Sequence, residues 1–429
     1  MKKAVLTAIC LLLSYISGAQ TFTLDECQRL ARENHPAIVQ LGLIEKSAKF
    51  TVSNARKNRL PQLTLTAQAT YQSEVPSLPE EFDPFLELAH IDIEGLKKDQ
   101  YGTSLQLEQV IWAGGLIKAQ AAIAEAEGKA LAQNWEVEMY AIREKVNQLY
   151  FGTLLVQERI GEADLLIGEL QRHDRLVRAY EANGVAGRND LDLMRVELLT
   201  ARQQKSELVA LHKAYRTMLG IMVGREMGEG AELEKPAAAD PGPLTQSARP
   251  ELAHFEAREH LLDAQHKGVN ASVMPQIGAF VQGAYGYPGP DFFKSMAERR
   301  FIPYYVAGVR LQWKFGGFYT RRNQLSQIEL KRTRIASQRD SFLYNMKLKG
   351  TQESIAIERM REVMRDDDEI ITLRTAIRKR TEAGVANGTQ SVSDLLGDIA
   401  SENLARQNRL AHEIELLKNI YDLKYTTNN

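Results

Sequence analysis

Four short segments of this chain alternate between apolar and polar residues, and each is joined to a long helical pattern. The cleanest alternation covers residues 63–71, where leucines, alanines and a tyrosine occupy odd positions and threonines and a glutamine occupy even ones. A period of two predicts a strand with one apolar and one polar face. The same pattern predicts strands at residues 101–112, 276–287 and 304–315. Strands of about ten residues have the length of a tilted membrane-spanning strand.

Helical patterns flank both pairs of strands. The first begins after the N-cap Thr23, is interrupted at Pro36 and ends before Pro61. After the first strand pair and Gly114-Gly115, a helix without proline is expected over residues 116–181, with a return helix over residues 190–222. In the second half we expect a helix that ends at residue 273, shortly before Pro275 and the second pair of strands. After Gly316-Gly317 come a long helix, a turn near residues 384–389 and a return helix to about residue 423.

The repeated order of elements indicates an internal duplication. Pro36 and Pro250 lie 214 residues apart (250 − 36), and so do Pro61 and Pro275 (275 − 61). We therefore assign residues 20–223 to a first structural repeat and residues 248–429 to a second repeat. Residues 224–247 between them are rich in Gly, Ala, Pro and Glu and are expected to form an equatorial linker of little regular structure. At the helical turns, matching 184–186 to 384–386 gives an offset of 200, whereas matching Gly184 to Gly388 gives 204. This disagreement predicts a small insertion in the second turn.

The N-terminal residues 1–19 have the features of a secretory signal peptide: Lys2-Lys3, a short apolar run and the small residues Ser17-Gly18-Ala19. Its removal would leave Cys27 as the single cysteine, so an internal disulfide is not expected. A net charge of −1 argues against a nucleic-acid partner. No paired metal-ligand spacing, phosphate-binding loop or nucleophile motif is present in the sequence, so we expect no metal, no cofactor and no catalytic residues.

Four strands cannot form a closed wall in lipid by themselves, because an open sheet leaves unpaired edges at several kcal/mol per group. Strands from two copies would make eight, whose interior is filled by side chains, whereas three copies would make twelve and leave a lumen. A soluble β-sandwich with one wet face is the alternative. In the membrane arrangement, the polar positions expected to line the lumen are Thr64, Thr66, Gln68, Gln106, Glu108, Gln282, Arg310 and Gln312.

The order helix, Pro-Gln, strand pair, Gly-Gly, very long helix, Gly-Val-Ala and return helix occurs twice, and it resembles the TolC family of outer-membrane efflux proteins. Asn34-His35-Pro36 is similar to the family's Asn-Asn-Pro. The resemblance implies a homotrimer with a twelve-stranded β-barrel in outer-membrane lipid and a long α-helical barrel in the periplasm. It implies a passive duct of a tripartite efflux or type I secretion system, fed by a periplasmic adaptor and an inner-membrane pump of RND or ABC type.

Two groups of site residues are expected at the far ends of the helices. Small apolar turn residues suit close docking of an adaptor; these are Gly184, Val185, Ala186, Gly384, Val385, Ala386 and Gly388. The family often carries Asp-Val-Leu-Asp on the second return helix, and Asp394 matches its first acid. Asp398 is displaced by one position from the second, and the resemblance assigns both aspartates to a pore constriction. The alternative function is a periplasmic coiled-coil adaptor or scaffold, which would be expected to have one helical hairpin between compact β domains.

Overall fold

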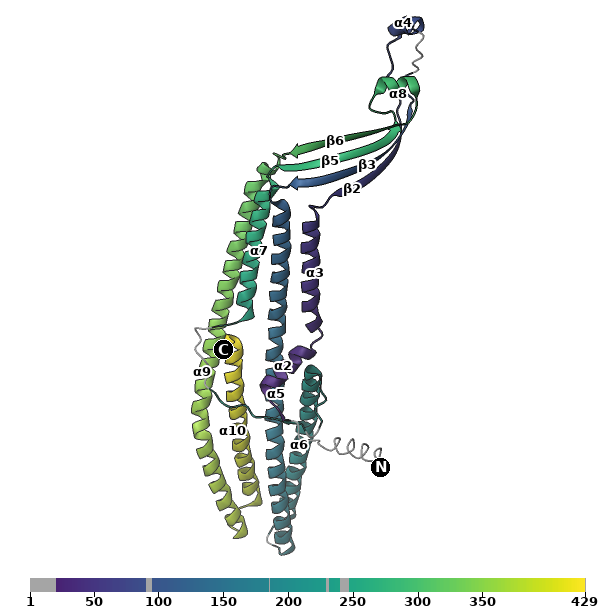
Figure 1. Cartoon of the computed structure of the whole chain (residues 1–429). Helices are drawn as coiled ribbons and strands as arrows, with labels where there is room; N and C mark the ends of the chain where they lie inside the picture. Colours follow the sequence, from purple (N-terminus) through teal and green to yellow (C-terminus); the bar gives the residue numbers. More distant parts are fainter. Residues whose placement is uncertain (1–20, 90–94, 185, 229–230, 240–246, 429) are drawn as a thin grey trace, which may run out of the picture. The chain divides into compact units, whose positions relative to one another are not determined.

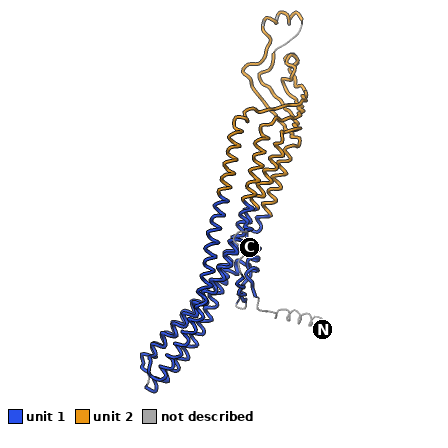
Figure 2. The backbone as a smooth tube through the Cα atoms, turned by 90° about the vertical axis from the view of Figure 1, so that its left-hand side faces the viewer, with its two compact units in different colours: residues 1–41, 133–254, 338–429 blue, residues 42–132, 255–337 orange. Residues whose placement is uncertain are grey.

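The computed structural model describes residues 21–89, 95–184, 186–228, 231–239 and 247–428. The expected signal peptide, residues 1–19, lies outside the described residues. The chain divides into two compact units, which are distinguished by colour in Figure 2. Unit 1 comprises residues 1–41, 133–254 and 338–429, and unit 2 comprises residues 42–132 and 255–337.

The main elements follow one another in the same order twice (Figure 1). The first series is α2 (Leu24–Asn34), α3 (Ile38–Lys57), β2 (Gln62–Tyr71), β3 (Asp99–Trp112), α5 (Leu116–Ala182) and α6 (Arg188–Val223). The second is α7 (Pro250–Ser272), β5 (Gln276–Tyr287), β6 (Ile302–Gln312), α9 (Gly317–Ala386) and α10 (Val392–Thr427). This helix–strand–strand–helix–helix order, with a break at Pro36, is the one predicted from the sequence.

The last strand ends earlier than the sequence pattern predicts. Alternation continues to Phe315, but β6 stops at Gln312. The indole nitrogen of Trp313 donates a hydrogen bond to the carbonyl of Val273, 3.0 Å away, and its ring contacts that of Phe315. These contacts turn the chain away from the sheet before α9 begins.

Unit 2 contains the four-stranded antiparallel sheet, whose strand order is β2-β3-β5-β6. The helix-side ends of the strands meet α3, α5, α7 and α9 (Figure 1). A core of Leu262, Ile328 and Ile335 packs α7 against α9. The helices α3 and α5 approach closely, because a Cβ atom at Gly128 would come within 2.4 Å of that of Ala48.

Two loops occupy the other ends of the strands. The first contains a short 3₁₀ turn, Glu80–Phe82, and α4 (Asp83–Leu88), and the second contains α8 (Phe292–Glu298). A small core of Leu96, Tyr287 and Met296 joins the bases of these loops. The hydroxyl of Tyr287 accepts a hydrogen bond from the backbone nitrogen of Lys97 at 2.9 Å. Residues 90–94 of the first loop are not among those described.

Unit 1 contains α2, α6 and α10 together with the remaining parts of α5 and α9. Thr23 is the N-cap of α2, since its hydroxyl accepts from the backbone nitrogen of Glu26. Asn34 ends α2 and donates to the carbonyls of Ile221 and Met222, which lie unpaired at the last turn of α6. The Asn34-His35-Pro36 motif thereby joins the end of one helix to the end of another.

The linker is more ordered than the sequence suggested. Within it, β4 (Glu232–Leu233) pairs in parallel with β1 (Thr21–Phe22). The hydroxyl of the buried Tyr150 lies within hydrogen-bond distance of the carbonyls of Phe22 (2.8 Å) and Glu234 (2.6 Å). The expectation of little regular structure is therefore wrong for these residues, because a long-range partner stabilises a strand too short to be recognised. Residues 229–230 and 240–246 of the linker lie outside the described part.

Candidate functional site

The strand register brings all eight expected lumen residues to one face of the sheet. Residues paired across an antiparallel sheet point to the same side. Thr64 pairs with Gln106, and Gln106 pairs with Gln282. The remaining five occupy positions of the same parity on β2, β3 and β6. These even-numbered residues form what we call the polar face.

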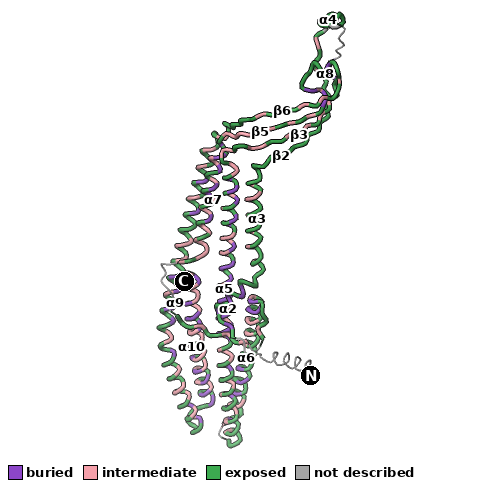
Figure 3. The backbone as a smooth tube through the Cα atoms, viewed as in Figure 1, coloured by how far each residue is buried: buried purple, intermediate pink, exposed green. Residues whose placement is uncertain are grey.

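The odd-numbered residues form the opposite face, which is largely apolar and largely open to solvent in the single chain. The edge strands β2 and β6 are mostly coloured as exposed in Figure 3. Leu65 is 72% exposed, Tyr305 80% and Val309 71%. Soluble proteins rarely leave so many large apolar side chains uncovered on one surface. This face therefore needs an apolar environment that the chain itself does not supply.

Only two charged side chains occur on the polar face of the four strands, and they pair with each other. The guanidinium of Arg310 lies 3.3 Å from the carboxylate of Glu108. It also lies 4.8 Å from the ring centre of Phe280, on the strand between them. Gly308 leaves room for that ring, since a Cβ atom there would come within 3.2 Å of it. Sequence reasoning placed Glu108 and Arg310 on this face but did not pair them.

At the far ends of the helices, the two turns have the same length and similar geometry. Five residues connect α5 to α6, and five connect α9 to α10. Gly184 has a φ of 72° and Gly388 has a φ of 68°, a region that favours glycine. These glycines are therefore structural equivalents, at the offset of 204. The predicted insertion in the second turn is wrong, because the extra residues lie in α9, which has 70 residues against 67 in α5.

The expected docking residues divide into three groups. Gly184, Ala386 and Gly388 are exposed, while Ala186 is half-buried. Gly384 and Val385 belong to the last turn of α9 and not to the connecting turn, and Val385 is buried at 6% exposure. Val185 lies outside the described residues. Val385 is thus wrongly assigned as an accessible contact, because it packs in the core beneath the turn.

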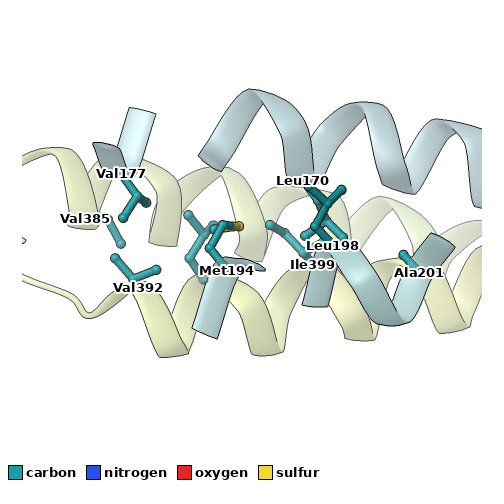
Figure 4. Close-up of a cluster of buried hydrophobic side chains, with 9 residues drawn as sticks. Leu170, Val177, Met194, Leu198, Ala201, Val385, Val392 and Ile399 are labelled. Atoms are coloured by element: carbon teal, nitrogen blue, oxygen red, sulfur yellow. The ribbon is translucent and has the colours of Figure 1, made fainter. Parts of the chain in front are cut away.

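That core joins the two helical hairpins of the chain (Figure 4). Leu170 and Val177 come from α5, and Met194 and Leu198 from α6. They contact side chains of α9 and α10, which are Val385, Val392, Leu395 and Ile399. Burial of each such side chain contributes about 1.5–3 kcal/mol. The two turns are consequently held together within one chain.

The two expected constriction residues have different surroundings. Asp394 is exposed and occupies the third position of α10, where its carboxylate accepts from the backbone nitrogen of Ser391 at 3.1 Å. Hydrogen bonds from the Ser391 side chain and backbone lower the pKa of Asp394. Asp398 instead accepts from the buried hydroxyl of Thr381, 2.6 Å away. Asp394 therefore remains available to solvent, whereas Asp398 is engaged by the neighbouring helix.

A buried ion-pair network near these turns was not expected from the sequence. The guanidinium of Arg378 lies 2.6 Å from Glu402 and 2.8 Å from Glu169, and so links α9 to α10 and α5. Burial alone would raise the pKa of Glu402, but hydrogen bonds from Arg406, Arg378 and Thr375 lower it. No sequence spacing could reveal the Glu169 contact, which joins residues about half the chain apart.

Within the described residues, no group of three histidine, cysteine or acidic side chains is arranged to hold a metal ion. The described helices also include none that is long and apolar enough to cross a membrane.

Residues 28–217 match the family model described as "Outer membrane efflux protein". A comparison with curated protein sequences finds no match. Among solved structures, the chain is similar to CusC with a TM-score of 0.71 and 12% identity, covering 94% of this chain and 91% of that one. It is similar to the outer membrane protein VceC of Vibrio cholerae, with a TM-score of 0.68, 14% identity and 94% of both chains covered.

The open-state MtrE outer membrane channel of Neisseria gonorrhoeae gives a TM-score of 0.64 at 16% identity, over 94% of this chain and 88% of that one. Each similarity covers both series of elements, and the shared fold combines long helices with a β domain. The fold is therefore one that this chain shares with outer-membrane channels. Residues 28–217 are thus similar to outer membrane efflux proteins, and the fold of the chain is that of solved outer-membrane channels.

Proposed function

We propose that three copies of this chain assemble into a passive duct with a closed twelve-stranded barrel and a helical tunnel. The observation that carries the proposal is the division of the sheet into a polar face and an exposed apolar face. Strands β2 and β6 are the edges of the sheet, and they have unpaired backbone groups along one side. In hydrocarbon each such group costs several kcal/mol, so a neighbouring copy must pair with it. Three copies, each supplying four strands, give a twelve-stranded barrel with an open lumen, whereas side chains would fill the interior of the eight-stranded barrel made by two copies.

In this assembly the polar face lines the lumen, with Glu108 and Arg310 as its charged members. Asp394 forms the constriction at the helical end, where three copies would bring three carboxylates together. Hydrogen bonds from Ser391 support its charged state at neutral pH. Because Asp398 is engaged by Thr381, the constriction depends on Asp394 alone.

We further propose that a periplasmic adaptor docks at the exposed turn residues Gly184, Ala386 and Gly388. The family match over residues 28–217 supports a role between such an adaptor and an inner-membrane pump, in either a tripartite efflux or a type I secretion system. The pump supplies the energy. A periplasmic scaffold is less well supported, since the family match is to efflux channels and not to adaptors.

Purification and planar-bilayer recording test the proposal. The full chain should require detergent, migrate as a trimer and produce stable conductance steps. A monodisperse monomer in the absence of detergent, or a detergent-purified trimer without conductance, would contradict the duct.

A further inference from the structure

The helix-side ends of the four strands are surrounded by a surface of one charge. We define the collar as the residues adjoining these strand ends, namely 52–61, 113–124, 264–275 and 313–325. All of them are described and all lie in unit 2. The collar contains eight basic residues and no acidic residue, although the whole chain has 54 basic and 55 acidic residues. The eight are Arg56, Lys57, Arg59, Lys118, Lys267, Lys314, Arg321 and Arg322.

Little of the collar's positive charge is compensated within the described residues, although Glu125, just beyond the second segment, is close enough to Arg56 for their charges to interact. Seven of the eight side chains are exposed, and Arg321 is half-buried against the neutral side chain of Asn270. None of the eight forms an ion pair with any described residue. Assembly would not neutralise the collar either, because each further copy brings the same four segments at the same level. Most of the counter-charge must therefore come from a molecule other than this chain.

The collar also carries large aromatic side chains. Trp313 is 47% exposed, Phe315 60% and Tyr319 85%. Aromatic rings beside basic residues are typical of the boundary between lipid and water. The loops at the opposite strand ends, residues 72–98 and 288–301, differ in charge, with nine acidic and five basic residues. The two ends of the sheet thus face different surroundings.

A groove beside the collar has the composition expected for an amphiphile. It measures about 700 Å³ and lies between α3 and α5. Arg56, Lys57 and Arg59 line it together with the apolar side chains of Ala48, Val52 and Leu60. Glu45, Lys49, Glu125 and Lys129 also line it, and Glu125 forms an ion pair with Lys129. A free anion would need only the cations, whereas a lipid would use both kinds of side chain.

We propose that the collar binds the phosphate headgroups of anionic phospholipids in the membrane leaflet next to the helices, with an acyl chain against Leu60, which lies beside the start of β2. This inference rests on the proposed function, because it requires the sheet to lie in a bilayer. Each Lys or Arg near an anionic membrane surface changes binding about fivefold. The attraction weakens as salt shortens the Debye length.

Native mass spectrometry of the full-length trimer tests the inference. Delipidated protein in non-ionic detergent is mixed with equal amounts of phosphatidylglycerol and phosphatidylcholine of identical acyl chains, and retained lipid is counted. We expect phosphatidylglycerol to be retained preferentially, and the preference to fall at least about tenfold in R56Q/K57Q/R59Q. K314Q/R322Q should weaken it independently. The matched control R195Q/R202Q/K213Q removes three exposed cations of α6, outside the collar, and should retain the preference.

Equal retention of the two lipids by the unmodified protein, or an unchanged preference in both collar variants, would overturn the proposal. Displacement of phosphatidylglycerol by an excess of inorganic phosphate would also overturn it, since the site would then recognise a free anion. Trimer migration and bilayer conductance are measured on the same preparations. If these are normal while the lipid preference is absent, only the collar inference fails; if they are absent, the proposed function itself fails.

Discussion

Glu353 on α9 is a carboxylate held away from water. Its side chain is 10% exposed, and the hydroxyl of Thr426 donates to one of its oxygens at 3.1 Å. The other oxygen is buried without a hydrogen-bond partner among the described residues. Burial raises the pKa of Glu353 to about 7, although the Thr426 hydrogen bond and Lys349 act in the opposite direction. Asp422 and Glu144 add to the increase.

This pKa predicts that Glu353 destabilises the helical unit at high pH. A carboxyl with a raised folded-state pKa binds its proton more tightly in the folded chain. Its contribution is therefore present below about pH 4.5 and is lost as pH rises through about 7. The lost free energy of unfolding is about 3 kcal/mol. Glu353→Gln should raise the Tm at pH 8 and leave it nearly unchanged at pH 5, as followed by the helical circular dichroism signal.

The control for this prediction is Glu144→Gln, since Glu144 is 40% exposed and also faces Lys349. It should change the Tm little at either pH. An equal effect of Glu353→Gln at pH 5 and pH 8 would show that the carboxyl does not titrate between these values.

Gly184 permits a sharper test of adaptor docking than a single bulky substitution. Its φ of 72° strains most side chains by about 1–2 kcal/mol, whereas asparagine tolerates this region. Nothing lies within 4 Å of a Cβ atom at this position, so a side chain would extend into open space. We expect Gly184→Arg to abolish dye efflux or protein secretion by the native cell while leaving trimers and conductance intact. Gly184→Asn should retain transport, and transport at the normal rate in Gly184→Arg would reject the docking role.

At the scale of elements, the two faces of the sheet predict opposite responses at neighbouring positions. Leu65 pairs with Leu105 on the apolar face, and Thr66 pairs with Ser104 on the polar face. A lysine facing lipid near the bilayer midplane costs about 2–4 kcal/mol, whereas one facing a lumen remains hydrated. Leu65→Lys should greatly reduce the trimer recovered from the outer-membrane fraction, and Thr66→Lys should not. Equal recovery of both variants would contradict the assignment of the faces.

Features set by local sequence could be predicted well. Alternation over nine to twelve residues defined the four strands, and the prolines at positions 36 and 61 defined the breaks of the first helices. In nearly all of this sheet, even-numbered residues pair with even-numbered residues on the neighbouring strands. The eight polar positions of one face therefore followed from the same alternation. The short pairing of β1 with β4 could not follow, because it depends on a partner more than 200 residues away.

The helical turns show where similarity of sequence misleads. Gly-Val-Ala occurs at both turns, but only Gly184 and Gly388 share the backbone conformation that defines the turn. A turn is set by the residue that adopts positive φ, and several small residues in succession do not reveal which one it is. Likewise, Arg378 pairs with Glu402 and Glu169 only because three helices meet with one particular rotation. Neither feature is encoded by periodicity.

At the scale of the whole molecule, the open question in the proposed assembly is which edges meet. A ring requires the β2 edge of one copy to pair with the β6 edge of the next, which is a heterologous contact. A twofold dimer would instead join identical edges, β2 to β2 or β6 to β6. The native thiol of Cys27 does not interfere, because it is buried and burial, with the nearby Glu26, raises its pKa to about 12.

Cysteine cross-linking distinguishes these arrangements. One cysteine replaces Thr66 on β2, and a second is placed in turn at Tyr304, Val306 or Gly308 on β6. A disulfide forms only where the two Cα atoms lie about 4.4–6.8 Å apart, so one β6 position should react best. The chain with both cysteines should give covalent dimers and trimers on oxidation, because each copy contributes both edges. Chains with a cysteine on one edge alone should give none, because identical edges never meet in a ring. Covalent dimers from Thr66→Cys alone would establish a twofold contact and exclude the closed trimeric barrel.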